Sequence, residues 1–341
     1  MQTLANPVAR IAAVNYFLPD ATLTNEQLSD EFPEWSVDKI GKKTGISSRR
    51  VAINGETTSS LAAKAAERLL SVSGVDRASI DYLILCTQSP DYYLPSTACI
   101  VQDLLGLPTN AGAMDINLGC SGYVYGLGLA SALVESGQAA NVLFITADTY
   151  SKFLNPSDKS VRTIFGDGAS ATLVSSVGGN KAIYGFSYGT DGAGAKHLIV
   201  PNGGLADGYE ISPRANVDDR GLTSNGFDLY MDGAEVFNFT LRVVPECIQQ
   251  TFEKTGLSDS DIDAYIFHQA NSFMLNTLRK KIGISPEKFI VEMENCGNTV
   301  SSSIPIALTE SLVSGKIKSG MKVMLVGFGV GLSWGAVIVE I

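Results

Sequence analysis

The chain has 341 residues, of which 45% are hydrophobic and 18% are charged, a composition typical of a globular protein with one large core or two fused halves. Its formal net charge of −10 disfavours a nucleic-acid-binding protein, whose contact face would be strongly basic. No apolar stretch is long enough for a membrane span and no signal segment is recognisable, so we expect no membrane association and a cytoplasmic location.

Short apolar segments alternate with helical segments rich in small residues along the chain. In chain order they predict a helix at 58–74, strands at 81–88 and 111–118, a helix at 121–137, and strands at 141–148 and 170–177. Such an alternation is typical of an α/β fold. No linker or low-complexity tract divides the chain.

Two parts of the chain resemble each other, which indicates an internal duplication. The stretch "SIDYLILCTQ" (79–88) is similar to "DIDAYIFHQA" (261–270). The stretch "LVESGQAANVLFI" (133–145) is similar to "LVSGKIKSGMKVMLV" (312–326). The sequence therefore predicts two similar α/β halves packed together.

The duplication relates three polar residues to one another. An offset of 178 residues, taken from the second pair of stretches, places Cys120 opposite Asn298. An offset of 182, taken from the first pair, places His268 opposite Cys86. Because ligands of open α/β sheets bind at a cleft beyond the strand ends, we expect Cys120, His268 and Asn298 to converge.

Cys120 lies where an apolar strand ends at Leu118 and a helix of small residues begins. Unpaired backbone N–H groups and the helix dipole favour a thiolate at that position, which predicts a nucleophile. The alternative is inert packing, the usual fate of a buried cysteine. The five cysteines lack metal-ligand spacing, so we expect free thiols and no metal site; they are Cys86, Cys99, Cys120, Cys247 and Cys296.

For His268 and for Asn298, the alternative to a functional role is an ordinary structural role. The chain has two histidines, His197 and His268, and His268 ends the apolar run "AYIFH". A histidine there is often a satisfied structural residue, but the matched positions of Cys120 and Asn298 favour a functional one. Asn298 is also a suitable helix N-cap, and the two roles are compatible.

Two glycine-rich strings have simple interpretations. "GFGVG" (327–331) follows a strand and precedes another strand, so a dinucleotide fingerprint is disfavoured and a loop presenting backbone N–H groups to a cleft is expected. "FGDGAS" (165–170) lacks the ending of a phosphate-binding loop, and a tight turn is expected there.

Several motifs together resemble one enzyme family. The Cys120 turn, "HQAN" (268–271), "GNTVSSSIP" (297–305), "FGDGASA" (165–171) and "GFGVGLSWGA" (327–336) are similar in content and order to 3-oxoacyl-(acyl carrier protein) synthase III, a branch of the thiolase-like condensing enzymes. The resemblance implies a layered αβαβα fold. Its halves are 1–178, with the nucleophilic cysteine, and 179–341, with the histidine and asparagine.

The resemblance also implies a decarboxylative Claisen condensation without metal or redox cofactor. Cys120 would take an acyl group from acyl-CoA, and His268 and Asn298 would stabilise the enolate of a malonyl thioester, which the resemblance implies is carried on acyl carrier protein. The backbone N–H groups of Cys120 and Val330 would form an oxyanion hole. Val330 replaces the usual central glycine of the terminal loop, which restricts φ. A homodimer is implied as well.

Further contacts follow from the family pattern. The residues assigned to CoA or substrate are Trp35, Lys43, Lys159, Asn271 and Phe328, and Leu94 is assigned to the acyl pocket of the neighbouring subunit, with Tyr92 or Tyr93 as alternatives. Arg279, Lys280 and Lys281 would dock the carrier protein, although Asn238 and Phe273 stand at two positions that are basic in the family. Trp35 precedes Lys43 by eight residues, whereas the tryptophan of the family precedes its arginine by four.

Two alternatives of different kinds stay open at this point. One is a specialised relative that moves an acyl group from Cys120 to an amine, a hydroxyl or another acceptor in a surface-sugar or secondary-metabolite pathway. The other is a non-catalytic partner subunit, which the presence of all three site residues disfavours. The acyl chain length, the carrier of the acceptor and the pathway do not follow from the sequence.

Overall fold

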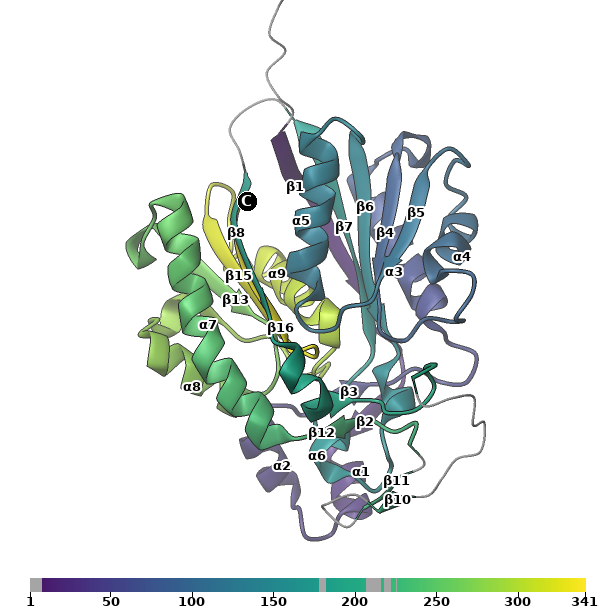
Figure 1. The fold of residues 1–341 in the computed structure, drawn as a ribbon, viewed down its shortest axis with the longest axis vertical. Helices are drawn as coiled ribbons and strands as arrows, with labels where there is room; N and C mark the ends of the chain where they lie inside the picture. The colour runs from purple at the N-terminus through teal and green to yellow at the C-terminus, as the bar shows by residue number, and fades with distance from the viewer. Residues whose placement is uncertain (1–7, 178–181, 207–215, 218–221, 225) are drawn as a thin grey trace, which may run out of the picture.

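Two five-stranded sheets form the body of the molecule (Figure 1). The computed structural model describes residues 8–177, 182–206, 216–217, 222–224 and 226–341. The first sheet has the order β1 (Val8–Phe17), β7 (Gly168–Val177), β6 (Asn141–Asp148), β4 (Tyr82–Cys86) and β5 (Gly112–Ile116). The second has the order β8 (Ile183–Thr190), β16 (Ser333–Glu340), β15 (Lys322–Gly329), β13 (Ala264–Phe267) and β14 (Phe289–Ile290).

The two sheets share one topology. In the first sheet, β4 runs parallel to β5 and β6, and β7 is antiparallel to both β6 and β1. In the second, β13 runs parallel to β14 and β15, and β16 is antiparallel to both β15 and β8. The predicted duplication of the α/β architecture is therefore confirmed. The expected boundary between residues 178 and 179 lies outside the described residues.

Helices complete the predicted αβαβα layering. Helices α5 (Gly122–Glu135) and α9 (Ser303–Val313) lie between the sheets, and α5 contacts strands of both (Figure 1). The outer helices are α3 (Thr58–Ser73) and α4 (Thr97–Leu104) over the first sheet, and α7 (Gly233–Thr255) and α8 (Ser272–Ile282) on the side of the second. Because α5 is enclosed, its small residues permit close packing: a Cβ at Gly126 would lie 2.2 Å from the Phe144 ring.

Matching hydrogen bonds support the residue alignment of the two halves. The Asp81 carboxylate accepts the backbone N–H of Asn141 at 2.9 Å, and the Asp263 carboxylate accepts that of Lys322 at 2.8 Å. The two aspartates occupy the same place before β4 and β13, which is the offset of 182 residues read from the sequence. The equivalence of Cys86 and His268 follows from it.

The predicted elements agree with the structure apart from one segment. The strand at 141–148 is found with the predicted bounds, and the other predicted strands and helices differ by three residues or fewer at each end. The tight turn predicted at 165–170 is wrong, because β7 already begins at Gly168 and Phe165 forms a parallel β-bridge with Asn298. This segment is therefore extended, and it contacts the second half of the molecule at Asn298.

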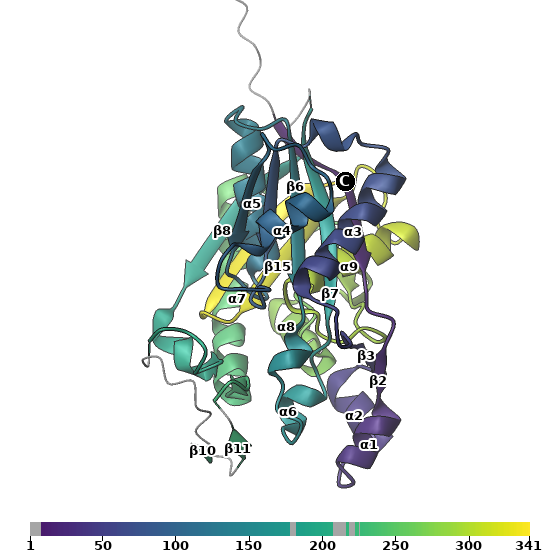
Figure 2. The same ribbon diagram turned by 90° about the vertical axis from the view of Figure 1, so that its right-hand side faces the viewer.

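A group of short elements lies beyond one end of the sheets (Figures 1 and 2). It contains β2 (Thr22–Thr24), α1 (Asn25–Glu31), α2 (Val37–Thr44), β3 (Ser48–Arg50) and α6 (Lys159–Arg162). The Arg162 guanidinium pairs with the Glu31 carboxylate at 2.9 Å, which joins α6 to α1. The remaining strands are β9 (Leu198–Ile199), β10 (Asn216–Val217), β11 (Thr223–Ser224) and β12 (Tyr230–Met231).

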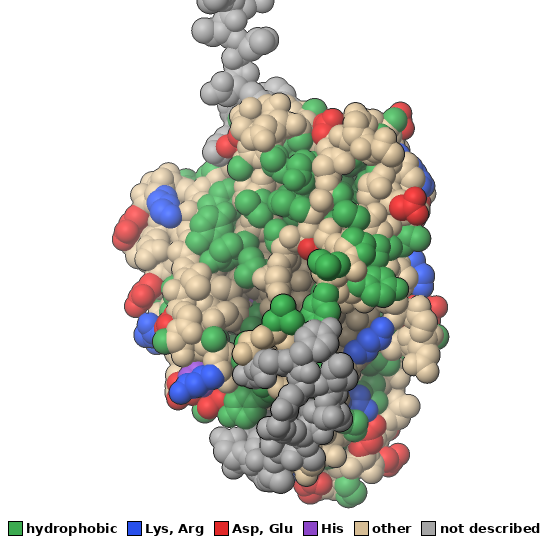
Figure 3. Space-filling view, turned by 45° about the vertical axis from the view of Figure 1, so that its right-hand side comes forward, with side chains coloured by type: hydrophobic (Ala, Val, Ile, Leu, Met, Phe, Trp, Pro, Cys, Tyr) green, Lys and Arg blue, Asp and Glu red, His purple; other side chains and the backbone are tan. Residues whose placement is uncertain are grey.

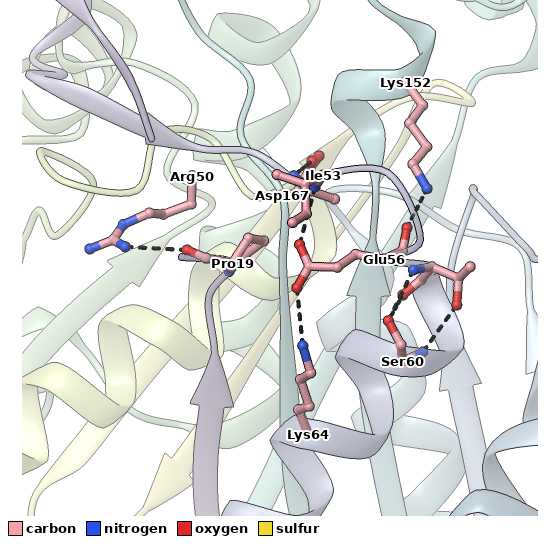
Figure 4. Close-up of polar contacts among 10 residues, drawn as sticks. Pro19, Arg50, Ile53, Glu56, Ser60, Lys64, Lys152 and Asp167 are labelled. Carbon is pink, nitrogen blue, oxygen red and sulfur yellow. Dashed lines mark hydrogen bonds and ion pairs between the residues drawn. The ribbon is translucent and has the colours of Figure 1, made fainter. Parts of the chain in front are cut away.

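The chain between β3 and α3 is held by polar contacts (Figure 4). The Glu56 carboxylate accepts the Ile53 backbone N–H at 3.1 Å and the Lys64 ammonium at 3.0 Å. The Asp167 carboxylate, which directly precedes β7, accepts the Ala52 backbone N–H at 2.6 Å. These contacts tie the short elements to the first sheet.

Among the described residues, no helix combines the length and the apolar composition that a bilayer span requires.

Candidate active site

A pocket of about 510 Å³ contains all three predicted site residues. Cys120, His268 and Asn298 line it together with residues from both halves of the molecule. Trp35, Lys42 and Lys43, from the group of short elements, line it as well. The predicted convergence is therefore confirmed.

Within the described ranges, no three His, Cys, Asp or Glu side chains gather closely enough to hold a metal ion.

Cys120 sits on a tight connection between β5 and α5. The backbone N–H of Gly122 bonds to the Gly119 carbonyl at 2.7 Å, and α5 begins at Gly122. The hairpin between β15 and β16 closes against this turn, because a Cβ at Gly329 would lie 2.8 Å from the Cys120 Cβ. Behind the turn, the Cys86 thiol donates to the Leu118 carbonyl at 3.1 Å. The nucleophile candidate is thus held from two sides.

The ionisation of Cys120 differs from the sequence-based expectation. Burial raises the pKa of the Cys120 thiol well above its ordinary range, and the nearby Asp148 carboxylate raises it further. The backbone N–H of Cys120 itself lowers this pKa, but by less. Burial and Asp148 therefore oppose the thiolate that the sequence predicts at this position.

His268 is a buried, neutral imidazole. It directly follows β13, its backbone N–H bonds to the Val326 carbonyl at 2.7 Å, and its ring lies edge-on to Phe328. The Nδ1 atom is 2.8 Å from the Ser303 hydroxyl. Burial lowers the pKa of His268 to about 3, against a smaller opposing effect of the Val300 backbone. His268 is therefore suited to donate a hydrogen bond without carrying charge.

Asn298 is fixed by the segment that sequence analysis assigned to a turn. Its backbone N–H bonds to the Ile164 carbonyl at 3.0 Å, and its carbonyl accepts the Gly166 N–H at 3.0 Å. The side-chain oxygen accepts the Val300 N–H at 2.9 Å, two residues further along the chain. Since the oxygen is engaged, the amide Nδ2 group is the part of the side chain left for a ligand. The predicted helix N-cap role is wrong, because Thr299 is the N-cap of the 3₁₀ turn Val300–Ser302 and Ser302 is that of α9.

The polar atoms of His268 and Asn298 form one candidate binding position. Asn298 Nδ2 lies 3.4 Å from His268 Nε2, and both residues line the pocket. When Nε2 carries the ring proton, both nitrogens are donors and an oxygen atom placed between them accepts two hydrogen bonds. Neutral donors in a dry pocket stabilise a developing oxyanion more strongly than donors in water do.

The depressed basicity of His268 leads to a prediction. The unfolded chain has a histidine pKa of about 6.5, so between that pH and about pH 3 the unfolded state binds a proton that folded His268 does not. This residue therefore makes folding less favourable as the pH falls through that window. We expect the His268 ring NMR signals not to titrate between about pH 5 and pH 8. A titration midpoint inside that range would contradict the buried neutral ring.

The predicted CoA residues occupy the pocket and its surroundings. The Lys43 ammonium lies 4.7 Å from the Trp35 ring centroid, and that of Lys159 lies 5.8 Å from it, so the longer spacing in sequence still brings them together. Lys159 also pairs with the Glu34 carboxylate at 2.6 Å. Asn271 lines the pocket, and its side chain caps α8 by accepting the Met274 N–H at 2.9 Å. Phe328 lines the pocket too.

Other predicted residues lie outside the pocket lining. Leu94 is 86% exposed, so it does not wall a pocket of its own chain. Arg279, Lys280 and Lys281 form the last turn of α8. Val330 lies between β15 and β16, and it is not among the described residues with positive φ, so valine is tolerated there without strain.

A set of buried hydroxyl and carboxyl groups, not predicted from the sequence, lies behind the site. Ser303 contacts His268, and the Ser301 hydroxyl donates to the Asp148 carboxylate at 2.6 Å. Asp148 also accepts the Gln88 backbone N–H at 2.8 Å, and burial raises its pKa to about 7. The signal in the sequence was the run "SSS" (301–303) inside an otherwise apolar segment, because consecutive buried hydroxyls require partners.

Comparisons with known proteins show which family the chain is similar to. The model of the family "3-Oxoacyl-[acyl-carrier-protein (ACP)] synthase III" matches residues 114–192, and the model of its C-terminal part matches residues 252–341. A beta-ketoacyl-[acyl-carrier-protein] synthase III of Clostridium perfringens is 39% identical over 337 residues, 98% of this chain and 99% of that protein. The protein of the same name from Clostridioides difficile is 40% identical over 338 residues, with the same coverage.

Solved structures show the same similarity. A crystal structure of a 3-oxoacyl-(acyl-carrier-protein) synthase III has a TM-score of 0.96 and 49% identity, covering 98% of this chain and 100% of that chain. The priming beta-ketosynthase from the R1128 polyketide biosynthetic pathway has a TM-score of 0.88 and 28% identity, covering 100% of this chain and 98% of that chain.

Proposed function

The chain belongs to the 3-oxoacyl-(acyl carrier protein) synthase III family, and from this we propose that it condenses an acyl group from acyl-CoA with a malonyl thioester through an acyl-Cys120 intermediate. The observation that carries the proposal is the pocket lined by Cys120, His268 and Asn298, in which two side-chain nitrogens lie 3.4 Å apart beside a cysteine. The product is a 3-oxoacyl thioester.

The first half-reaction transfers the acyl group to Cys120. The sulfur attacks the thioester carbonyl of acyl-CoA, the bond from that carbonyl to the CoA sulfur breaks, and the thiol proton ends on the CoA sulfur. Because burial raises the pKa of the Cys120 thiol, its proton is proposed to leave as the new bond forms. Backbone N–H groups of Cys120 and Val330 are proposed to hold the carbonyl oxygen during the attack.

The second half-reaction uses His268 and Asn298. The carboxylate of the malonyl thioester leaves as carbon dioxide, and the electron pair passes to the thioester oxygen as an enolate. The Nε2 and Nδ2 donors stabilise that oxygen, and the buried site keeps His268 neutral throughout. The enolate carbon then attacks the acyl-Cys120 carbonyl, and the carbon–sulfur bond to Cys120 breaks. The released sulfur takes up one proton. No electron transfer is required, so we propose no cofactor.

The aromatic and positively charged side chains at the pocket are proposed to bind CoA. Trp35 presents an aromatic face, and Lys42, Lys43 and Lys159 place positive charge in its neighbourhood, which suits the adenine and phosphates of CoA. Asn271 and Phe328 line the route toward Cys120. The acceptor is proposed to arrive on acyl carrier protein, docked by Lys280 and Lys281 of α8 with Arg279.

We also propose a homodimer located in the cytoplasm. Tyr92, Tyr93 and Leu94 are 63%, 80% and 86% exposed, which is unusual for three consecutive large apolar side chains. Figure 3 shows that hydrophobic side chains gather on one face of the molecule, where a second copy would cover them. In that dimer, Leu94 would reach the acyl pocket of the neighbouring subunit.

The proposed position of Leu94 predicts the size of the acyl donor. Leucine occupies less volume than the phenylalanine of relatives restricted to short primers, and each additional buried methylene contributes about 0.8 kcal/mol. We expect a donor longer or more branched than acetyl to be preferred, and Leu94→Phe to shift the preference toward acetyl. The measurement is kcat/KM for acetyl-, butyryl-, isovaleryl- and octanoyl-CoA. Acetyl preference in the parent protein would contradict the prediction, and an unchanged ranking in Leu94→Phe would exclude Leu94.

One experiment tests the proposed function as a whole. The protein is incubated with a panel of acyl-CoAs, and intact mass spectrometry detects the acyl-enzyme. Malonyl-CoA or malonyl-(acyl carrier protein) is then added, and 3-oxoacyl product is measured. We expect acylation followed by condensation. Acyl transfer to an amine or hydroxyl acceptor, without 3-oxoacyl product, would overturn the proposal.

A further inference from the structure

We propose that Ser303 is a positioning residue that fixes the His268 ring in the tautomer with its proton on Nε2. The proposal deepens the proposed function, on which it rests for its catalytic consequence. Its structural basis is the contact of 2.8 Å between the Ser303 hydroxyl and His268 Nδ1. Which nitrogen carries the proton follows from the other partners of that hydroxyl.

The hydroxyl of Ser303 has a defined direction. The backbone N–H of Gln269 points at the Ser303 oxygen from 3.2 Å, and an N–H group can only donate. The oxygen therefore accepts that bond. Its buried proton also requires an acceptor, and of the two contacts given for this hydroxyl only Nδ1 of His268 can accept one, so we infer that the proton is directed there. A ring nitrogen that accepts a hydrogen bond carries no proton, so in the neutral imidazole the proton is on Nε2.

The surroundings keep this arrangement in place. Ser303 is the first residue of α9 and is 2% exposed, and its backbone N–H bonds to the Val300 carbonyl. Gln269 is held by both ends of its side chain: the nitrogen donates to the Phe267 carbonyl at 2.6 Å, and the oxygen accepts the Glu292 N–H at 2.8 Å. The Gln269 N–H donor and the Ser303 hydroxyl are thus both held in place by buried, hydrogen-bonded segments.

The tautomer decides whether the pocket holds one donor or two. With the proton on Nε2, His268 and Asn298 Nδ2 both direct hydrogens at the same oxygen position. With the proton on Nδ1, Nε2 presents a lone pair there and repels an enolate oxygen. Because burial keeps the ring neutral, protonation does not supply the missing hydrogen, and Ser303 is the group that selects the useful form.

The tautomer is directly observable in this chain, which has two histidines. The full-length protein is labelled with ¹⁵N-histidine, and two-bond ¹H–¹⁵N spectra show which ring nitrogen is protonated. A His197→Gln variant assigns the signals. We expect protonated Nε2 in the parent protein and loss of that single form in Ser303→Ala. The matched control is Ser302→Ala, which removes a neighbouring buried hydroxyl that bonds to Thr146 instead, and it should keep the parent tautomer.

Kinetics give the second readout. We expect Ser303→Ala to lower kcat for malonyl decarboxylation by about tenfold to a hundredfold, less than the about 10⁴-fold cost of a catalytic histidine held entirely in the wrong tautomer. Acylation of Cys120 should change little, and Ser303→Thr, which keeps the hydroxyl, should restore both the tautomer and the rate. Circular dichroism of each variant confirms folding.

The two proposals fail in different ways. Protonated Nδ1 in the parent protein, or an unchanged tautomer in folded Ser303→Ala, would overturn the role of Ser303 whatever the enzyme catalyses. Protonated Nε2 that is lost in Ser303→Ala, in a parent protein without condensation activity, would support Ser303 and overturn the proposed function.

Discussion

Replacing Cys120 with alanine is expected to lower the rate of condensation by at least about a thousandfold, because no other group in the pocket forms the acyl intermediate. Acyl-CoA should label Cys120 and leave the other four thiols unmodified. Cys86, Cys247 and Cys296 are buried outside the pocket lining, and Cys99 is exposed on α4. Peptide mapping after incubation with acyl-CoA is the measurement.

Cys99→Ser is the matched control for this prediction. It removes the exposed thiol and should leave both labelling and turnover unchanged. Acylation that persists in Cys120→Ala, or that maps to another cysteine, would show that the nucleophile is assigned wrongly. A folded Cys120→Ala protein is expected, since the smaller side chain removes only a thiol from the pocket wall.

The second large effect is a separation of the half-reactions. His268→Ala and Asn298→Ala each remove one donor to the enolate oxygen, and the loss of one such donor lowers kcat by about a hundredfold to a thousandfold. Acyl transfer to Cys120 should survive at least partly, because neither side chain forms the acyl bond. The assays are malonyl decarboxylation and acyl-enzyme formation, measured on the same protein preparations.

Two further variants sharpen this test. Asn298→Asp keeps the size of the side chain but places a carboxylate oxygen where Nδ2 donates, so decarboxylation should be as slow as in Asn298→Ala. His197→Ala removes the other histidine and should leave both half-reactions intact. Equal and complete loss of acylation and decarboxylation in Asn298→Ala would indicate a purely structural asparagine, whose side-chain oxygen holds the Val300 backbone N–H.

The fold was predictable because the duplication repeats local patterns. The strand at 141–148 has an apolar run with clear ends, and the two aspartates that precede β4 and β13 marked equivalent positions. Local pattern and tertiary structure agree in these places. The offset of 178 residues, which paired Cys120 with Asn298, holds at the C-terminal ends of α5 and α9, but the first residues of these helices are 181 apart. Cys120 therefore stands opposite Ser301 and the predicted pairing is wrong, although the convergence in one pocket was predicted correctly.

Other features depend on contacts that sequence does not display. The role of residues 165–167 comes from β-bridge contact with Asn298, which lies more than a hundred residues away, so a local turn pattern was misleading. The pKa of the Cys120 thiol is raised by burial and by Asp148, and neither contact can be read from the local sequence. The contact between Ser303 and His268 depends on the packing of α9 beside β13. Long-range packing decided each outcome.

Cys86 shows how far the two halves have diverged in chemistry. It stands where the second half has His268, yet burial raises its pKa well above the ordinary range, and its thiol supports the Leu118 carbonyl instead of facing a substrate. Duplicating a catalytic module would yield two equivalent chambers, whereas in the proposed mechanism one copy supplies the nucleophile and the other the oxyanion donors. On this proposal neither half is a complete enzyme, and saturating acyl-CoA is expected to load a single acyl group on each polypeptide.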